Sequence, residues 1–139
     1  MKILGIDYGK ARIGLSISDE SFKIAFPLEV VAAFHNNDKT VEAVIKVISK
    51  FQIQEIVIGL PLLMTGKDSP MSLDVRAFAK KLEEKTGIAV HLWDERLTSK
   101  QVEREMIDAD MKRKKRAQLV DVMAATLILQ SYLDAKNSA

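Results

Sequence analysis

The chain has 139 residues, of which 47% are hydrophobic, with a formal net charge of +2 and no cysteine. This length fits one domain with a real core, and the lack of cysteine excludes disulfides, thiolate metal sites and cysteine nucleophiles. No stretch approaches the roughly 20 apolar residues of a membrane span, and charged residues follow the N-terminus too early for a signal peptide. We therefore expect a soluble cytoplasmic protein with no membrane partner.

The first residues, 3–17, predict a β-hairpin, because apolar residues alternate on either side of a short connection that contains Gly9. Asp7 ends the first strand, and a lone carboxylate is costly to bury there unless something pairs with it. A divalent metal is a common partner of this kind, and Gly9 lets a backbone or a phosphate come close. The alternative is that both residues only make the turn.

Apolar segments continue along the chain at residues 24–31, 40–51 and 56–60. The first is a strand that Pro27 confines to a sheet edge or a bulge. The second has helical spacing, and the third is a short apolar run typical of a buried strand.

The next predicted helix begins at Ser69, an N-cap followed by proline, and ends at Gly87. Residues 88–93 then predict another buried strand, which runs into an acidic pair. Thr98 and Gln101 have the spacing of a capping box and predict a third helix to about residue 107.

The last predicted helix covers residues 117–133, and it is apolar nearly all round, as a buried helix is. Asp121 lies within it, although aspartate is almost never fully buried without a partner. At 100° per residue Asp121 shares a face with Ala124 and Ala125, whose small side chains would let the helix approach a sheet closely. Alternatively, Asp121 serves the first turn of the helix.

This order of elements predicts an α/β fold in one domain, residues 1–139. The early hairpins indicate antiparallel strands, and the later crossovers indicate parallel ones. We expect a mixed five-stranded sheet with helices on both faces.

Acidic residues interrupt apolar segments at three places: Asp7, the pair Asp94 and Glu95, and Asp121. Carboxylates that converge stay ionised only if cations neutralise them, and hard oxygen ligands select Mg²⁺ or Mn²⁺. Two such ions can activate a water and stabilise the leaving oxygen of a phosphodiester. If the three places meet, the residue types favour metal-dependent phosphodiester hydrolysis.

A basic run precedes the last helix, with the members Lys112, Arg113, Lys114, Lys115 and Arg116. Blocks of like charge often contact nucleic acid, and the alternative is a solvated surface.

Several motifs occur together and in a characteristic order: LGIDYGKARIG near the start, GLP at 59–61, Gly66, DERLTS at 94–99 and VDVMAATLILQSYL at 120–133. With these motifs the chain resembles the bacterial Holliday-junction-resolvase family, also described as pre-16S ribosomal RNA processing nucleases. The resemblance implies an RNase H-like fold with three antiparallel strands followed by two parallel ones. It also implies a hydrolase, a divalent-metal endonuclease that acts on structured RNA or branched DNA as a monomer or homodimer.

The resemblance assigns the catalytic and metal-binding roles to Asp7, Asp121 and one acid of the DER segment. Between Asp94 and Glu95 we favour Glu95; strand alternation points the two to opposite faces, so only one of them would face the metals. Arg96 could instead pair with a neighbouring acid.

For nucleic-acid binding the resemblance implies Gly9, Arg12 as a phosphate contact, and the basic run. The expected activity is 5′ processing of precursor 16S ribosomal RNA, with Holliday junction resolution as the alternative. A non-catalytic RNA-binding module would need the basic run without the acids. An ATP-binding phosphotransferase also places an acid-x-Gly hairpin at the start of its sheet, but it needs two such domains.

Overall fold

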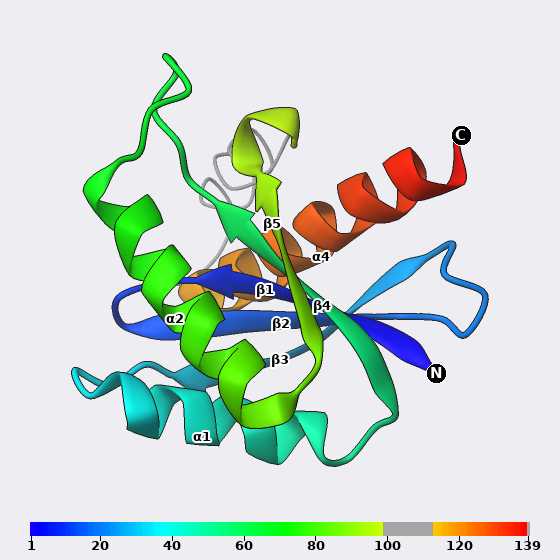
Figure 1. Cartoon of the computed structure of the whole chain (residues 1–139), viewed down its shortest axis with the longest axis horizontal. Coiled ribbons are helices and arrows are strands. Elements are labelled where there is room, and N and C mark those ends of the chain that lie inside the picture. Colours follow the sequence, from blue (N-terminus) through cyan, green and yellow to red (C-terminus); the bar gives the residue numbers. More distant parts are fainter. Residues whose placement is uncertain (99–112, 139) are drawn as a thin grey trace.

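The computed structural model describes residues 1–98 and 113–138, and it has a five-stranded sheet covered by helices on both faces (Figure 1). The strands are β1 (Lys2–Tyr8), β2 (Arg12–Ser18), β3 (Ala25–Ala32), β4 (Ile53–Leu60) and β5 (Ala89–Asp94). The helices are α1 (Asn37–Ile48), α2 (Pro70–Thr86) and α4 (Arg113–Asn137), and a short 3₁₀ turn, η1 (Glu95–Leu97), follows β5.

The strand order is β3-β2-β1-β4-β5. Strands β1, β2 and β3 pair antiparallel, whereas β4 pairs parallel with both β1 and β5. This topology confirms the predicted mixed sheet of three antiparallel strands followed by two parallel ones.

Strand alternation gives the sheet two different faces. Leu4 and Ile6 of β1 belong to a large aliphatic core together with side chains of α1 and α2. Ile3 belongs to a smaller cluster with Ile128 and Leu129 of α4, which crosses behind the sheet in Figure 1. The period-2 pattern of the first strands therefore separates a face for α1 and α2 from a face for α4.

Several elements form where local sequence signals predict them. Strand β3 lies at the sheet edge, and the register of its pairing with β2 shifts where Ser16 faces Pro27. Ser69 accepts a hydrogen bond from the backbone of Ser72 to start α2, and Gly87, with φ of 70°, ends it in the left-handed conformation.

Three predicted features differ from the structure. Strand β5 is the other sheet edge, so the prediction that it is buried was wrong, and its residue His91 is exposed. Helix α1 begins at Asn37 because the Asn36 side chain accepts a hydrogen bond from the Asp38 amide at 2.8 Å. Helix α4 begins at Arg113, so it takes in part of the basic run.

The predicted helix after β5 lies outside the described residues, as does its capping partner Gln101. Thr98 is described, and its hydroxyl donates to the Glu95 carbonyl at 2.8 Å, which closes η1.

Helix α4 packs unusually close to the sheet. Ser16 donates its hydroxyl to the Ala125 carbonyl at 2.7 Å, and a Cβ added to Gly5 would lie 2.7 Å from the Cβ of Leu129. A Cβ on Gly14 would collide with the carbonyl oxygen of Asp121. The predicted close approach through small residues is confirmed. Within the described ranges, no helix combines the length and apolarity needed to cross a membrane.

Candidate functional site

Asp7 is a buried carboxylate on the α4 side of the sheet, with only 6% of its surface exposed. Strand alternation places it on that face together with Gly5. Its partner on β2 is Gly14, and Gly59 on β4 comes one residue beyond the Ile6–Ile58 pair. Because neither neighbouring glycine has a side chain, space around the end of β1 is left to groups from other elements.

Glu95 fills part of that space. It follows directly after β5, whose last residue pairs with Leu60 of β4. A Cβ built on Gly59 would lie 2.6 Å from the Oε1 atom of Glu95, and the Cδ1 atom of Ile128 would be equally close at 2.5 Å. The Glu95 carboxylate therefore lies over Gly59, on the same face of the sheet as Asp7.

Asp94 is in a different environment. Its carboxylate accepts hydrogen bonds from the Arg96 side chain, at 3.0 Å from Nε and 2.6 Å from Nη2, and also from the Arg96 amide. The hydrogen bond from the guanidinium holds the pKa of the Asp94 carboxyl below its usual value. Arg96 thus pairs with a neighbouring acid, as the sequence had suggested.

Asp121 lies in the third turn of α4, so the alternative that it serves the helix N-terminus was wrong. Its carbonyl group packs over Gly14, the strand partner of Asp7. Its carboxylate, 14% exposed, pairs with the Nε atom of Arg12 at 2.5 Å. Arg12, at the start of β2, is 43% exposed. The sequence had suggested a phosphate contact for Arg12, and the pairing with Asp121 had no signal in the sequence.

The structure therefore brings three predicted acids to one end of one face: Asp7 on β1, Glu95 after β5, and Asp121 on α4. The residues in the described parts include no group of three or more His, Cys, Asp or Glu side chains that could together hold a metal ion. In this arrangement the carboxylate of Asp121 is bound to a guanidinium, that of Glu95 lies over Gly59, and Asp7 is the strand neighbour of Gly14.

The remaining predicted residues fall into two groups. Gly9 allows the tight connection between β1 and β2, since a Cβ there would lie 2.6 Å from the Arg12 carbonyl oxygen. Residues 113–116 of the basic run lie in the first turn of α4, while Lys112 falls outside the described residues.

Sequence reasoning missed the small residues that make room for the site. Gly14 and Ser16 alternate with large aliphatic residues along β2, and Gly59 has the same place on β4. That alternation is readable in the sequence: a strand that is small on one face and aliphatic on the other favours close packing of a backbone on the small face.

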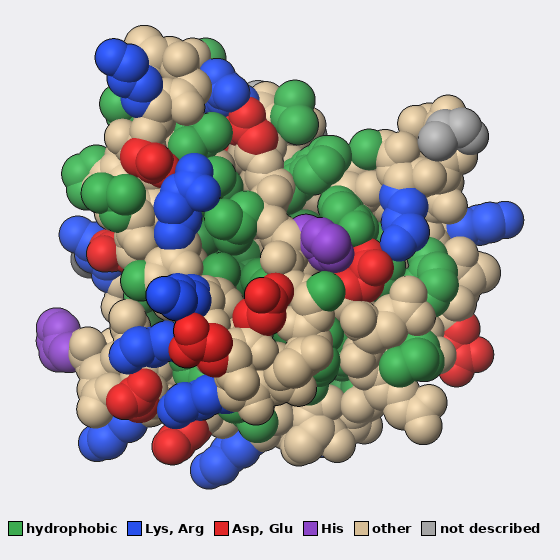
Figure 2. Space-filling model, viewed as in Figure 1, with side chains coloured by type: hydrophobic (Ala, Val, Ile, Leu, Met, Phe, Trp, Pro, Cys, Tyr) green, Lys and Arg blue, Asp and Glu red, His purple; other side chains and the backbone are tan. Residues whose placement is uncertain are grey.

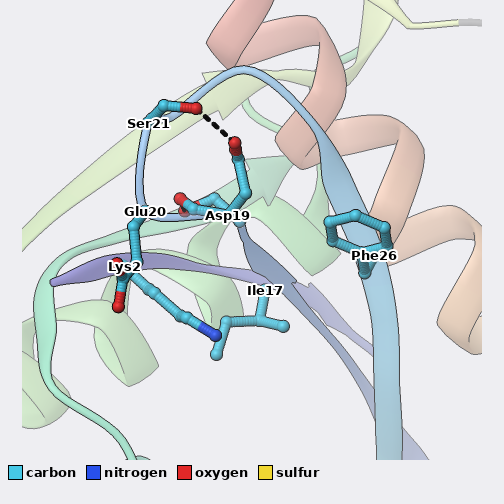
Figure 3. A pocket seen from close by; sticks show the side chains of 7 residues that line it. Lys2, Ile17, Asp19, Glu20, Ser21 and Phe26 are labelled. Carbon is cyan, nitrogen blue, oxygen red and sulfur yellow. Dashed lines mark hydrogen bonds between the residues drawn. The ribbon is translucent and has the colours of Figure 1, made fainter.

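A pocket of about 640 Å³ lies elsewhere, beside Lys2, Ser18 and Phe26 (Figure 3). This is the end of the sheet where β1 starts and β2 finishes, so it lies at the opposite end of β1 from Asp7. The Asp19 carboxylate there accepts hydrogen bonds from the Ile24 amide, which has the largest effect, and from the Ser21 hydroxyl. These hydrogen bonds lower the pKa of Asp19 to about 2. Asp19 therefore organises the β2–β3 connection.

Solved structures define the fold class. The chain is similar to RuvC of T. thermophilus in complex with Holliday junction substrate, with a TM-score of 0.63 and 16% identity over 100% of this chain and 97% of that one. It is also similar to the fowlpox virus resolvase, with a TM-score of 0.59 and 15% identity over 98% and 99% of the two chains. The fold is that of the RNase H-like resolvases, as predicted.

The chain belongs to the RuvX family, described as Holliday junction resolvase, which matches residues 1–135. Two relatives carry the name "Putative pre-16S rRNA nuclease". The one from Protochlamydia amoebophila is 45% identical over 97% of this chain and 94% of its own length. The one from Caldanaerobacter subterraneus subsp. tengcongensis is 41% identical over 100% of both. These matches confirm the resemblance drawn from the motifs and identify the chain as a hydrolytic nuclease.

Proposed function

We propose that this nuclease is a divalent-metal-dependent endonuclease that cleaves structured nucleic acid, with precursor 16S ribosomal RNA as its substrate. The observation that carries the proposal is the position of the Asp7 and Glu95 carboxylates on one face of the sheet, beside Gly14 and Gly59. The names of the relatives support the choice of substrate. Processing of ribosomal RNA would place the protein in the cytoplasm.

The donor set at this end of the sheet fits a hard cation. Oxygen atoms of carboxylates suit Mg²⁺ and Mn²⁺, and Asp7, Glu95 and Asp121 are the residues that would hold such ions. The carboxylate of Asp121 now binds Arg12, so it would exchange the guanidinium for a metal ion. A bound ion would activate a water and stabilise the leaving oxygen of the phosphodiester.

The chain's own cations would hold the nucleic acid. Arg12 is more than one-third exposed beside Asp121, and once released it can contact a phosphate next to the acids. Gly9 keeps the connection between β1 and β2 compact, and in this proposal the nucleic-acid backbone approaches the site there. The basic run, residues 112–116, would bind phosphates sequence-independently. This assignment requires no particular oligomer, and either a monomer or a homodimer can use it.

Holliday junction resolution is the second candidate. It is favoured by the description of the family and by the fold shared with resolvases. In that case the same acids would cut branched DNA, and the chemistry would be identical.

Cleavage by the purified protein tests the proposal. The wild type, Asp7→Asn and the control Glu42→Gln are incubated with precursor 16S ribosomal RNA, a four-way DNA junction and single-stranded RNA. Each is tested with Mg²⁺, with Mn²⁺ and with EDTA. Glu42 is a suitable control because it is exposed on α1, on the other side of the sheet.

We expect the wild type and Glu42→Gln to cut the precursor RNA near its 5′ end in the presence of metal, and Asp7→Asn to be inactive. Preferential cutting of the junction would select the second candidate. Undiminished cleavage in EDTA, or by Asp7→Asn, would contradict the metal mechanism.

A further inference from the structure

The connection between β4 and α2 carries exposed apolar side chains at its tip. We call this segment, residues 62–67, the tip loop. Leu63 is 47% exposed and Met64 is 87% exposed. The loop projects from the body of the protein at the top of Figure 1, and Figure 2 shows hydrophobic and basic side chains next to one another there. Large apolar side chains this exposed, on a projecting loop, have no role in the core.

The tip loop has a defined shape. The Leu63 amide donates to the Lys67 carbonyl at 2.9 Å, and the Gly66 amide donates to the Leu63 carbonyl at 2.8 Å. Gly66 has φ of 88°, a left-handed conformation that glycine adopts without strain. At the base of the loop, Ser69 donates its hydroxyl to the Pro61 carbonyl at 2.6 Å. The apolar side chains are thus presented on a turn closed by its own hydrogen bonds.

Arg96 ties this loop to the candidate site. Its Nη1 atom donates to the Met64 carbonyl at 3.2 Å, while the same guanidinium binds both carboxylate oxygens of Asp94. A Cβ on Gly66 would lie 3.5 Å from Nη1, an ordinary van der Waals distance, so the tip of the loop lies directly against the guanidinium. Arg96 directly follows Glu95 in η1. One side chain therefore links the tip loop to the turn that carries an acid of the site.

We infer that Leu63 and Met64 pack against a nucleobase that is unpaired beside the bond to be cut. The inference rests on the proposed function and deepens it, because it makes an unpaired or unstacked base part of the substrate. Apolar side chains such as leucine and methionine wedge against base steps in other nucleic-acid-binding proteins.

The charges near the tip fit this occupant. Lys67 is exposed on the loop and supplies a positive charge that can pair with a phosphate of the bound strand, whereas the charge of Arg96 is balanced by Asp94. Two side chains are also far too few for a protein partner, since a specific interface buries about 1,200–2,000 Å². A single base is an occupant of the right size.

Fluorescence of 2-aminopurine, a base analogue sensitive to stacking, tests the inference. One RNA stem-loop carries it in a single-stranded flank, and a second carries it inside the stem. Both are titrated in EDTA, so that binding is measured without cleavage. The proteins are the wild type, the double variant Leu63→Ser/Met64→Ser, and the control Ile24→Ser. Ile24 is 53% exposed and lies at the other end of the sheet, so it matches the exposure of Leu63.

We expect the wild type and Ile24→Ser to change the fluorescence of the flank probe, and the double variant to abolish this change. Its affinity for the flank RNA should fall roughly 10- to 150-fold, the range for losing the burial of one leucine or methionine side chain, and its affinity for the stem probe should not. Thermal melting confirms that the variants fold.

The inference is overturned if the wild type gives no response, or if the double variant responds like the wild type. It is also overturned if affinity falls equally for both RNAs. These outcomes are separate from the cleavage test. A fluorescence response that depends on Leu63 and Met64, without metal-dependent cleavage, refutes only the proposed function. Metal-dependent cleavage without such a fluorescence response refutes only this inference.

Discussion

The two faces of the central sheet differ sharply in what they contribute. Towards α1 and α2, β1 presents Leu4 and Ile6, which are fully buried in a continuous aliphatic core. Towards α4, the same strand presents Gly5 and Asp7. Burial of apolar side chains on the first face stabilises the fold. On the second face, small residues let a helix backbone and several acids come close to one another.

The α4 face has a smaller apolar cluster around Ile3, and next to it α4 also contacts the sheet by direct backbone packing and hydrogen bonding. Ser16 bonds to the Ala125 carbonyl, and the Ser18 hydroxyl accepts from the Ile3 amide at 2.8 Å. Gly14 touches the backbone of Asp121. Backbone contacts therefore determine how α4 packs on the face that carries the candidate site, so this face should tolerate added side-chain volume poorly. The aliphatic face should instead be sensitive to removal of side-chain volume.

The largest loss of stability should come from truncation on the aliphatic face. Leu4→Ala leaves a cavity in the core and should lower the free energy of unfolding by about 2–5 kcal/mol. Urea denaturation measures this loss. A change below about 1 kcal/mol would show that the α1 and α2 face does not carry the stability.

A smaller loss should follow from added volume on the opposite face. Gly14→Ala places a methyl group against the Asp121 carbonyl and should cost about 1–3 kcal/mol, the usual cost of overpacking. It should also displace α4 and reduce cleavage. The same denaturation experiment serves as the readout, and a neutral or stabilising effect would show that α4 does not rest on the bare glycine.

A still smaller effect is expected from the ion pair between Arg12 and Asp121. Because Arg12 is 43% exposed, solvent screens the pair, and a double-mutant cycle with Arg12→Gln and Asp121→Asn should give a coupling of about 0.2–1 kcal/mol without metal. Saturating Mn²⁺ should abolish this coupling if Asp121 turns to the metal. Coupling that persists in Mn²⁺ would mean that Asp121 keeps Arg12 and binds no ion.

The basic run should affect binding and leave stability nearly unchanged. Replacing Lys114, Lys115 and Arg116 by glutamine should alter the free energy of unfolding by less than about 0.5 kcal/mol. The slope of log affinity against log salt should fall in magnitude by about 0.7–0.9 for every phosphate that the variant no longer neutralises. RNA titrations at several salt concentrations provide the test, and an unchanged slope would leave the run as a solvated surface.

The fold was predictable because its signals are local. Strand alternation, Pro27 at an edge strand, and the caps Ser69 and Gly87 each act through neighbouring residues. The edge position of β5 was not predictable, since an apolar run does not reveal whether its strand has neighbours on both sides.

The acids of the site stood out because a carboxylate within an apolar segment is conspicuous. Their partners were hidden in long-range pairings: Arg12 meets Asp121 across 109 residues, and Arg96 meets Met64 across 32. Such pairings depend on the folded topology, so no pattern along the chain marks them.

Titration with Mn²⁺ tests whether the carboxylates on the α4 face of the sheet bind a cation. Isothermal titration calorimetry without nucleic acid compares the wild type, Asp7→Asn and the control Glu42→Gln. We predict that Asp7→Asn weakens Mn²⁺ binding by at least about tenfold, since even residues that only support a ligand are worth 10–100-fold. Glu42→Gln should bind as the wild type does. Equal Mn²⁺ affinity in Asp7→Asn and the wild type would show that Asp7 holds no cation, and the proposed role of this face would be wrong.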